Sequence, residues 1–154
     1  MVEIIIPDNL TNWYAGGIVY ESSRKLLAVV VDWDNYRSPC PKPFGGKGEA
    51  WDESPMATAR REGREEINFD LPEPGEPISY RWRGDHGSCL FLWRMGAEEF
   101  DNQLVYSRRE HELGGRSKIV HVMHVQQVLA AGEKEFVPYY KTALEPTLFR
   151  LMSE

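Results

Sequence analysis

The sequence contains few cysteines and no long apolar run. Its two cysteines, Cys40 and Cys89, lack the close spacing of a metal-binding motif, which favours a reducing intracellular setting over a disulfide scaffold. The apolar stretch in MVEIIIPDNL is too short for a signal peptide. No segment approaches the roughly 20 apolar residues of a membrane span. The sequence therefore predicts a soluble, cytoplasmic protein with no membrane partner.

An excess of positive charge is also absent. The formal net charge is −6, which argues against broad, non-specific nucleic-acid binding. A phosphate ligand is still compatible with this charge, because a bound divalent cation reverses the local sign. The 154 residues are 42% hydrophobic and 12% aromatic, and no internal repeat divides them. We therefore interpret residues 1–154 as a single domain with its own core.

Hydrophobic periodicity predicts a mixture of strands and helices. Residues 14–21 and 26–33 are typical of two strands, which we expect to form a hairpin across SSRK. The polar segment 96–115 is interpreted as mostly loop. Further strands are expected at residues 78–83, 88–95 and 118–125, and helices at residues 126–131 and 141–152. This mixture predicts an α/β layered domain whose strand order does not follow from the sequence.

One further helix has clear boundary signals. Ser54 is a favourable N-cap residue, and Pro55 follows it at the first helical position. The helix is expected to run to about Ile67, because Asn68 suits the left-handed conformation that ends many helices. Within it, Ala59 and Gly63 fall on one narrow stripe of small residues, which favours close packing of this helix onto a sheet.

The same helix carries a charge conflict in the stretch REGREE. Glu62 precedes Glu65 by three residues and Glu66 by four, and like charges at these spacings destabilise a helix by roughly 0.2–0.5 kcal/mol per pair. One interpretation is a solvated charged face, assisted by the neighbouring arginines. The other is that the carboxylates are partly removed from water and surround a hard divalent cation such as Mg²⁺ or Mn²⁺.

Residues 46–69 resemble the signature of the Nudix hydrolases, G-x5-E-x7-R-E-U-x-E-E-x-G-U, in which U is a bulky aliphatic residue. Glu53 is followed, after seven residues, by Arg61 and Glu62, and then by Glu65 and Glu66. The segment AGGIVY is similar to the first core strand of the family, and FGG precedes the helix.

The chain departs from this signature at three places. The loop between Gly46 and Glu53 is one residue longer than the family pattern. Gly63 stands at the first U position, and Asn68 replaces the glycine that follows the glutamate pair. The longer loop leaves the metal-binding carbonyl open between Gly45, Gly46 and Lys47, of which the resemblance favours Gly46.

The resemblance implies a Nudix fold, which is an α/β/α sandwich around a mixed β-sheet. It also implies a pyrophosphohydrolase that uses Mg²⁺ or Mn²⁺ to cleave a nucleoside diphosphate linked to another moiety. The substrate class stays open among nucleoside triphosphates, dinucleoside polyphosphates, nucleotide sugars and capped RNA 5′ ends. The alternative is a Nudix-fold module that binds or senses a nucleotide with little or no turnover. Many members of the family dimerise, so a homodimer is an expectation.

The family's functional positions carry over onto residues of this chain. The implied catalytic residues are Glu62, Glu65, Arg61 and Glu53. The implied metal ligands are Glu62, Glu65, Glu66, the Gly46 carbonyl and one carboxylate outside the signature, for which Glu112 is preferred to Glu110. Candidates for substrate binding, by their position near the signature, are Arg37, Tyr36 and Lys47. Packing or surface solvation is the competing explanation for these three side chains.

If a cation relieves the repulsion within REGREE, Mg²⁺ should raise the melting temperature of the protein. The double variant Glu65→Gln/Glu66→Gln should show a smaller gain, because it lacks two of the charged oxygen ligands. Thermal unfolding with and without Mg²⁺ measures both. An equal gain in the variant and the wild type would contradict the cation interpretation.

Overall fold

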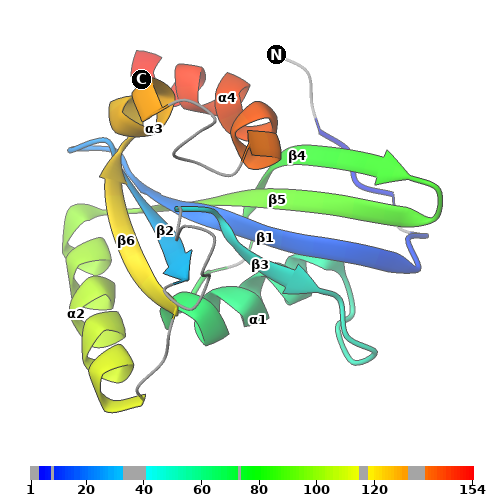
Figure 1. Ribbon diagram of the computed structural model, residues 1–154, viewed down its shortest axis with the longest axis horizontal. Coiled ribbons are helices and arrows are strands. Elements are labelled where there is room, and N and C mark those ends of the chain that lie inside the picture. The colour runs from blue at the N-terminus through cyan, green and yellow to red at the C-terminus, as the bar shows by residue number, and fades with distance from the viewer. Residues whose placement is uncertain (1–3, 8, 33–40, 73, 115–117, 132–137) are drawn as a thin grey trace.

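The computed structural model describes residues 4–7, 9–32, 41–72, 74–114, 118–131 and 138–154 (Figure 1). In chain order, its elements are β1 (Asn12–Glu21), β2 (Leu26–Asp32), β3 (Phe44–Lys47), α1 (Pro55–Ile67), β4 (Glu76–Arg83), β5 (His86–Met95), α2 (Ala97–Gly114), β6 (Lys118–His124), α3 (Val125–Ala131) and α4 (Pro138–Ser153).

A six-stranded mixed sheet runs through the described part of the chain in the order β4-β5-β1-β2-β6, with β3 also paired to β1. One edge of β1 pairs in parallel with β5. Its other edge is shared, because residues 14–17 pair antiparallel with β3 and residues 19–21 pair antiparallel with β2. This edge therefore divides into two branches, and the β3 branch carries Gly45 and Gly46 toward α1.

Helices cover both faces of the sheet (Figure 1). One apolar cluster joins the sheet to α1 and α2 through residues that include Phe44, Ala59 and Phe100. A second cluster joins the opposite face to α3 and α4 through residues that include Val128 and Leu148. The predicted α/β/α sandwich around a mixed sheet is confirmed.

The stripe of small residues on α1 faces the sheet, as the sequence predicts. Ala59, Gly63 and Ile67 are buried. A Cβ atom at Gly63 would lie 2.5 Å from Cδ1 of Leu71 and 3.2 Å from Cε2 of Phe44. These distances are shorter than ordinary van der Waals contact, so glycine sets how near α1 lies to the β3 branch.

The sequence-based prediction for residues 96–115 is wrong, because residues 97–114 form the helix α2. Phe100, Leu104 and Ser107 are buried at helical spacing, while most other side chains of the helix are polar. Three buried positions make a narrow stripe, which is too weak a periodic signal to stand out in this polar segment. Contact with β6, and of Phe100 with Phe69 just after α1, stabilises the helix.

The other expected elements are confirmed, with shifted ends. The hairpin of β1 and β2 forms, and the last two helices begin at Val125 and Pro138. The short strand β3 has no counterpart in the sequence-based expectations, since two glycines lower its strand propensity and pairing with β1 overrides it. Across the described residues, no helix is long and apolar enough to cross a membrane.

Gly63→Val should lower the free energy of unfolding by about 1–3 kcal/mol, because the added atoms overpack the contact with Leu71 and Phe44. Arg64→Val, at the next and exposed position of the same helix, is the control and should cost less than about 0.5 kcal/mol. Urea unfolding measures both. Equal effects at the two positions would contradict the packing role of Gly63.

Candidate functional site

The helix α1 has the ends that its sequence predicts. The Ser54 side chain accepts a hydrogen bond from the Ala57 N–H, and Pro55 occupies the first turn. At the other end, Asn68 adopts the left-handed conformation with φ 55° and ψ 38°. These caps fix where α1 begins and ends, while the packing of Ala59, Gly63 and Ile67 on the sheet fixes which of its glutamates face inward.

Glu66 is the most deeply buried of the three glutamates, with 7% of its surface exposed. Its Oε2 accepts a hydrogen bond of 3.2 Å from the Gly45 N–H. Its Oε1 accepts one of 3.2 Å from Nζ of Lys118, at the start of β6. Burial raises the pKa of Glu66, and the charges of Lys118 and Lys42 offset only part of this effect.

Glu62 lies one turn before Glu66 and packs against β3. A Cβ atom at Gly46 would lie 2.2 Å from Oε1 of Glu62, so the absence of a side chain at Gly46 makes room for this carboxylate. Burial raises the pKa of Glu62, and the negative charge of Glu66 raises it further. The two glutamates are therefore close enough to repel each other in a site with restricted access to water.

Glu65 differs from the other two glutamates, because 57% of its side chain is exposed. Its Oε2 lies 3.1 Å from Nη1 of Arg61. The position places Glu65 at the rim of the site, while Glu62 and Glu66 line its interior. The structure thus brings two of the three predicted carboxylates together and leaves the third at the edge.

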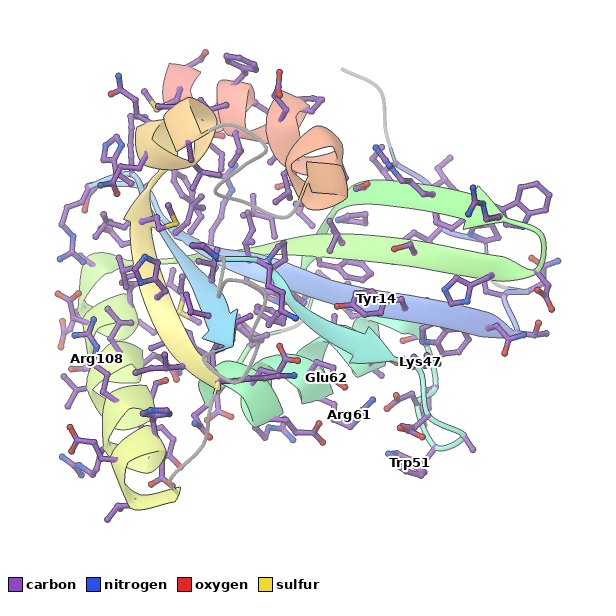
Figure 2. The ribbon with its side chains drawn as sticks, viewed as in Figure 1. Tyr14, Lys47, Trp51, Arg61, Glu62 and Arg108 are labelled. Atoms are coloured by element: carbon purple, nitrogen blue, oxygen red, sulfur yellow. The ribbon has the colours of Figure 1, made fainter. Side chains whose placement is uncertain are left out.

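Arg61, which is labelled with Glu62 and Lys47 in Figure 2, connects the loop before α1 to these acids. Its Nη1 donates to Oε1 of Glu62 at 3.0 Å, and its Nη2 donates to the Lys47 carbonyl at 3.1 Å. The same guanidinium makes two hydrogen bonds to the Asp52 carboxylate, of 3.2 and 3.0 Å. A bidentate contact of this kind gives both strength and a defined orientation.

Asp52 is a residue that the sequence analysis missed. Its side chain is 4% exposed. Besides Arg61, it accepts hydrogen bonds from the Glu49 N–H at 2.9 Å and from Oγ1 of Thr58 at 2.8 Å. Burial alone would raise the pKa of Asp52, but the hydrogen bond from Arg61 and the other two donors hold it below its usual range. Asp52 is therefore the ionised partner that anchors the loop to α1.

The loop spacing carries a signal for Asp52 on one side only, because the seven-residue interval to Arg61 still matches Glu53. Five residues separate Gly46 from Asp52, which is the family's interval, whereas six separate Gly46 from Glu53. Glu53 is exposed and lines a separate cavity of about 620 Å³. No hydrogen bond or ion pair joins Glu53 to Arg61 in the described part of the chain. Asp52 thus has the loop-fixing role expected of Glu53, while metal contact by Glu53 stays a prediction.

The remaining predicted residues are spread around the site. Lys47 is exposed at the end of β3, directly opposite Tyr14 of β1. Glu112 is exposed in the last turn of α2, and no described contact joins it to the acids of α1. Tyr36 and Arg37 lie outside the described residues. Substrate binding by Lys47, Tyr36 and Arg37 and metal binding by Glu112 stay predictions.

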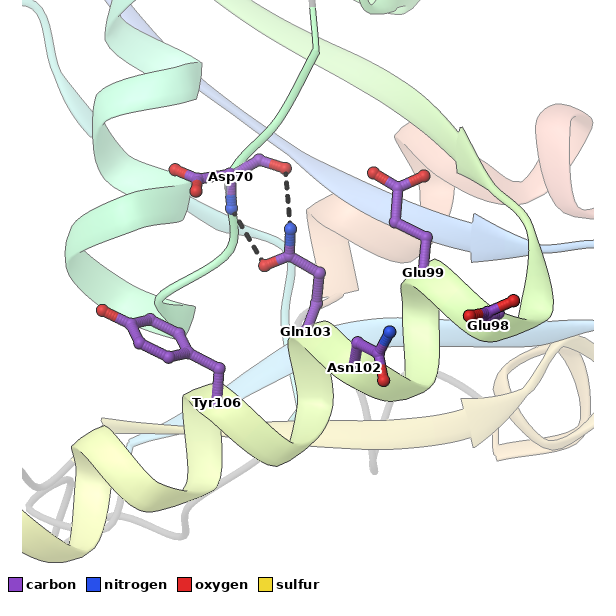
Figure 3. A pocket seen from close by; sticks show the side chains of 6 residues that line it. All are labelled: Asp70, Glu98, Glu99, Asn102, Gln103 and Tyr106. Carbon is purple, nitrogen blue, oxygen red and sulfur yellow. Dashed lines mark hydrogen bonds between the residues drawn. The ribbon is translucent and has the colours of Figure 1, made fainter.

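A second hollow, of about 580 Å³, lies apart from these carboxylates, between the end of α1 and the start of α2 (Figure 3). The Gln103 side-chain amide pairs with the Asp70 backbone there, through hydrogen bonds of 3.2 and 3.4 Å. Glu98 and Glu99 also line this hollow. It contains neither Arg61 nor any glutamate of α1, so it is not part of the predicted site.

Glu62 and Glu66 fit a hard divalent cation by their chemistry. They are carboxylates held close together, the negative charge of Glu66 raises the pKa of Glu62, and carboxylate oxygens are ligands that hard divalent cations prefer. The position of Gly46 beside Glu62 places backbone next to this pair. Within the described ranges, no group of three or more His, Cys, Asp or Glu side chains is arranged to hold a metal ion.

Comparison with known proteins finds a similar structure but no similar sequence. No protein-family model matches the chain, and no curated protein matches it by sequence. The mixed sheet and its helical layers form a Nudix fold. This chain is similar to a solved structure of MutT, a Nudix hydrolase. That structure comes from a study of the MutT proteins of Aliivibrio salmonicida and Vibrio cholerae. The match covers 92% of this chain and 97% of the other, with a TM-score of 0.56 and 15% identity.

Asp52→Asn should lower the free energy of unfolding by about 1–3 kcal/mol, because Arg61 loses its ionised, bidentate partner. The matched substitution at the neighbouring acid, Glu53→Gln, should cost less than about 0.5 kcal/mol, since Glu53 is exposed. Urea unfolding of both variants at neutral pH is the measurement. The assignment is wrong if Glu53→Gln is the more damaging substitution.

Proposed function

We propose that this protein is a Nudix-type pyrophosphohydrolase, which uses Mg²⁺ or Mn²⁺ to hydrolyse a nucleoside diphosphate linked to another moiety. The observation that carries the proposal is the pair Glu62 and Glu66, held in repulsion beside the glycines of β3 within a Nudix fold. Arg61 and Lys118 each pair with one of these acids, yet burial keeps the pKa of both raised, so the chain compensates their charge only in part.

The divalent cation would be held by Glu62 and Glu66, with Glu65 and the Gly46 carbonyl as further ligands at the rim. When bound, such a cation polarises phosphoryl oxygens and lowers the pKa of bound water. The rest of the chemistry falls to residues of this chain. Glu62 is also the candidate general base, because its partly buried carboxylate faces the glycines of β3 at the interior of the site.

Two basic residues support this arrangement. Arg61 orients the Glu62 carboxylate through its 3.0 Å hydrogen bond and is itself held by Asp52. Lys47 lies at the exposed end of β3, from which its ammonium can bind a phosphate of the substrate. Positioning and charge neutralisation of this kind account for most of the catalysis in phosphate chemistry.

The identity of the second moiety is left open by this site. Four substrate classes contain the diphosphate that Lys47 and the metal ion held by the carboxylates would bind. They are nucleoside triphosphates, dinucleoside polyphosphates, nucleotide sugars and capped RNA 5′ ends. A homodimer, the absence of a membrane partner and a cytoplasmic setting belong to the same proposal and rest on the sequence.

A binding or sensing module is the second candidate. The ion pair between Lys118 and Glu66 favours it, because this pair neutralises one of the two acids without any metal. A module that binds nucleotide without turnover would need no free carboxylate at that position. Turnover therefore separates the two candidates.

The test is a panel of the four substrate classes with Mg²⁺ or Mn²⁺, with release of phosphate, pyrophosphate or nucleotide as the readout. Glu62→Gln and Glu66→Gln should each lower the kcat on the active substrate by at least about 10²-fold. Glu98→Gln, an exposed acid on α2, is the charge-matched control and should retain activity.

Two results would contradict the proposal. A wild type that binds a nucleotide but hydrolyses nothing on the panel would favour the binding module. Full activity in both glutamine variants would remove Glu62 and Glu66 from the mechanism, whatever the wild type hydrolyses.

A further inference from the structure

A lysine from outside α1, Lys118 of β6, reaches the buried carboxylate of Glu66. Nζ of Lys118 lies 3.2 Å from Oε1, across 52 residues of chain. The backbone of Lys118 is held in place from two sides. It pairs with Asp32 of β2, and its carbonyl lies 3.2 Å from Nδ1 of His111 at the end of α2. The start of β6 therefore presents Lys118 to the acid pair in a defined position.

The two partners of this ion pair differ in their access to water. The Glu66 side chain is 7% exposed, whereas the Lys118 side chain is 38% exposed. Glu66 is also tied to the Gly45 N–H, so the carboxylate cannot leave without losing that hydrogen bond. Lysine carries its charge on a flexible four-carbon stem. If the pair separates, Lys118 is the partner that moves, because its ammonium can remain hydrated while it does so.

We propose that Lys118 is a substrate-binding residue with two alternative partners: it neutralises Glu66 in the metal-free protein, and it binds a phosphate of the substrate once a divalent cation engages Glu66. This inference rests on the proposed hydrolase function. It gives the Lys118 ammonium a direct part in coupling metal binding to substrate binding.

Charge explains why the exchange is favourable in both states. Without metal, loss of Lys118 would leave Glu62 and Glu66 repelling each other with less compensation. With a divalent cation among the acids, the ammonium is repelled from the same place, since like charges at contact distance are unfavourable. An ammonium has three donors and no acceptor, so the phosphate oxygens of an incoming substrate are its natural next partner.

The first measurement is the binding of Mg²⁺ alone, by titration calorimetry of the full chain and by thermal unfolding at increasing Mg²⁺. Lys118→Met should bind Mg²⁺ about threefold more tightly or better, because no ammonium has to be displaced. Lys118→Arg keeps the competing charge and should resemble the wild type. Lys118→Gln is a second neutral variant, which keeps the test valid if the methionine variant folds poorly.

Arg83→Met is the matched control for net charge. Arg83 is exposed at the far end of β4, and no described residue forms an ion pair with it. Its loss changes the overall charge as Lys118→Met does, so it should leave Mg²⁺ binding within about twofold of the wild type. Tighter Mg²⁺ binding in Arg83→Met and Lys118→Met alike would overturn the displacement of Lys118, because net charge would then explain the effect. Unchanged Mg²⁺ binding in both neutral Lys118 variants would also overturn it.

The second measurement is the binding of the methylene-bridged, non-hydrolysable analogue of ADP in saturating Mg²⁺. Lys118→Met should weaken this binding about tenfold, as expected for the loss of one charge-assisted contact. On an active substrate, the same variant should raise the KM more than it lowers the kcat. Unchanged binding of the analogue would overturn the phosphate-binding role.

These readouts separate the inference from the proposed function. If the substrate panel shows no hydrolysis but Lys118→Met tightens Mg²⁺ and weakens the analogue, the hydrolase proposal fails and the role of Lys118 stands. If hydrolysis occurs and depends on Glu62 and Glu66, but neither binding constant changes in Lys118→Met, the inference about Lys118 fails by itself.

Discussion

The close approach of α1 to the β3 branch of the sheet is the contact on which the site depends. It is possible because Gly63 presents no side chain to Leu71 and Phe44, and because Gly46 presents none to Glu62. The approach buries Glu66 and removes most of the Glu62 side chain from bulk water, whereas Glu65 stays exposed on the same helix. A helix that lay farther from the sheet would carry the same acids as ordinary surface charges.

Burial of these negatively charged side chains is unfavourable, and the positive charges of the surrounding chain offset only part of this effect. Arg61 donates to Glu62 and Lys118 to Glu66, yet the pKa of both glutamates remains raised because burial outweighs these contacts. Arg61 is itself committed to Asp52, whose pKa is lowered. The site thus contains one fully compensated acid, Asp52, which anchors the loop. It also contains two acids, Glu62 and Glu66, whose burial is compensated only in part and which are the candidates for metal binding and catalysis. This division separates the structural part of the loop from its reactive part.

Local signals predicted the fold where the relevant interactions are local. Ser54 and Asn68 marked the ends of α1 because capping involves only the neighbouring turn. The hairpin of β1 and β2 followed from two apolar runs and a short turn. The sequence does not predict the helix α2, because its three buried side chains form a packing face only once β6 and Phe69 lie against them. Strand β3 was missed for a similar reason, because pairing with β1 overrides the low strand propensity of its glycines.

For the site, the sequence by itself determined the helix that carries the acids, its orientation stripe and the family resemblance of its spacing. These properties depend on residues within a few turns of one another. Only the tertiary structure decided that Asp52, not Glu53, anchors Arg61, because the path of the loop decides which carboxylate the guanidinium reaches. It likewise decided that Lys118 meets Glu66, because strand pairing brings together residues that no local pattern connects. Sequence spacing specifies which groups share a face, whereas packing specifies which of them lose water and which partners reach them.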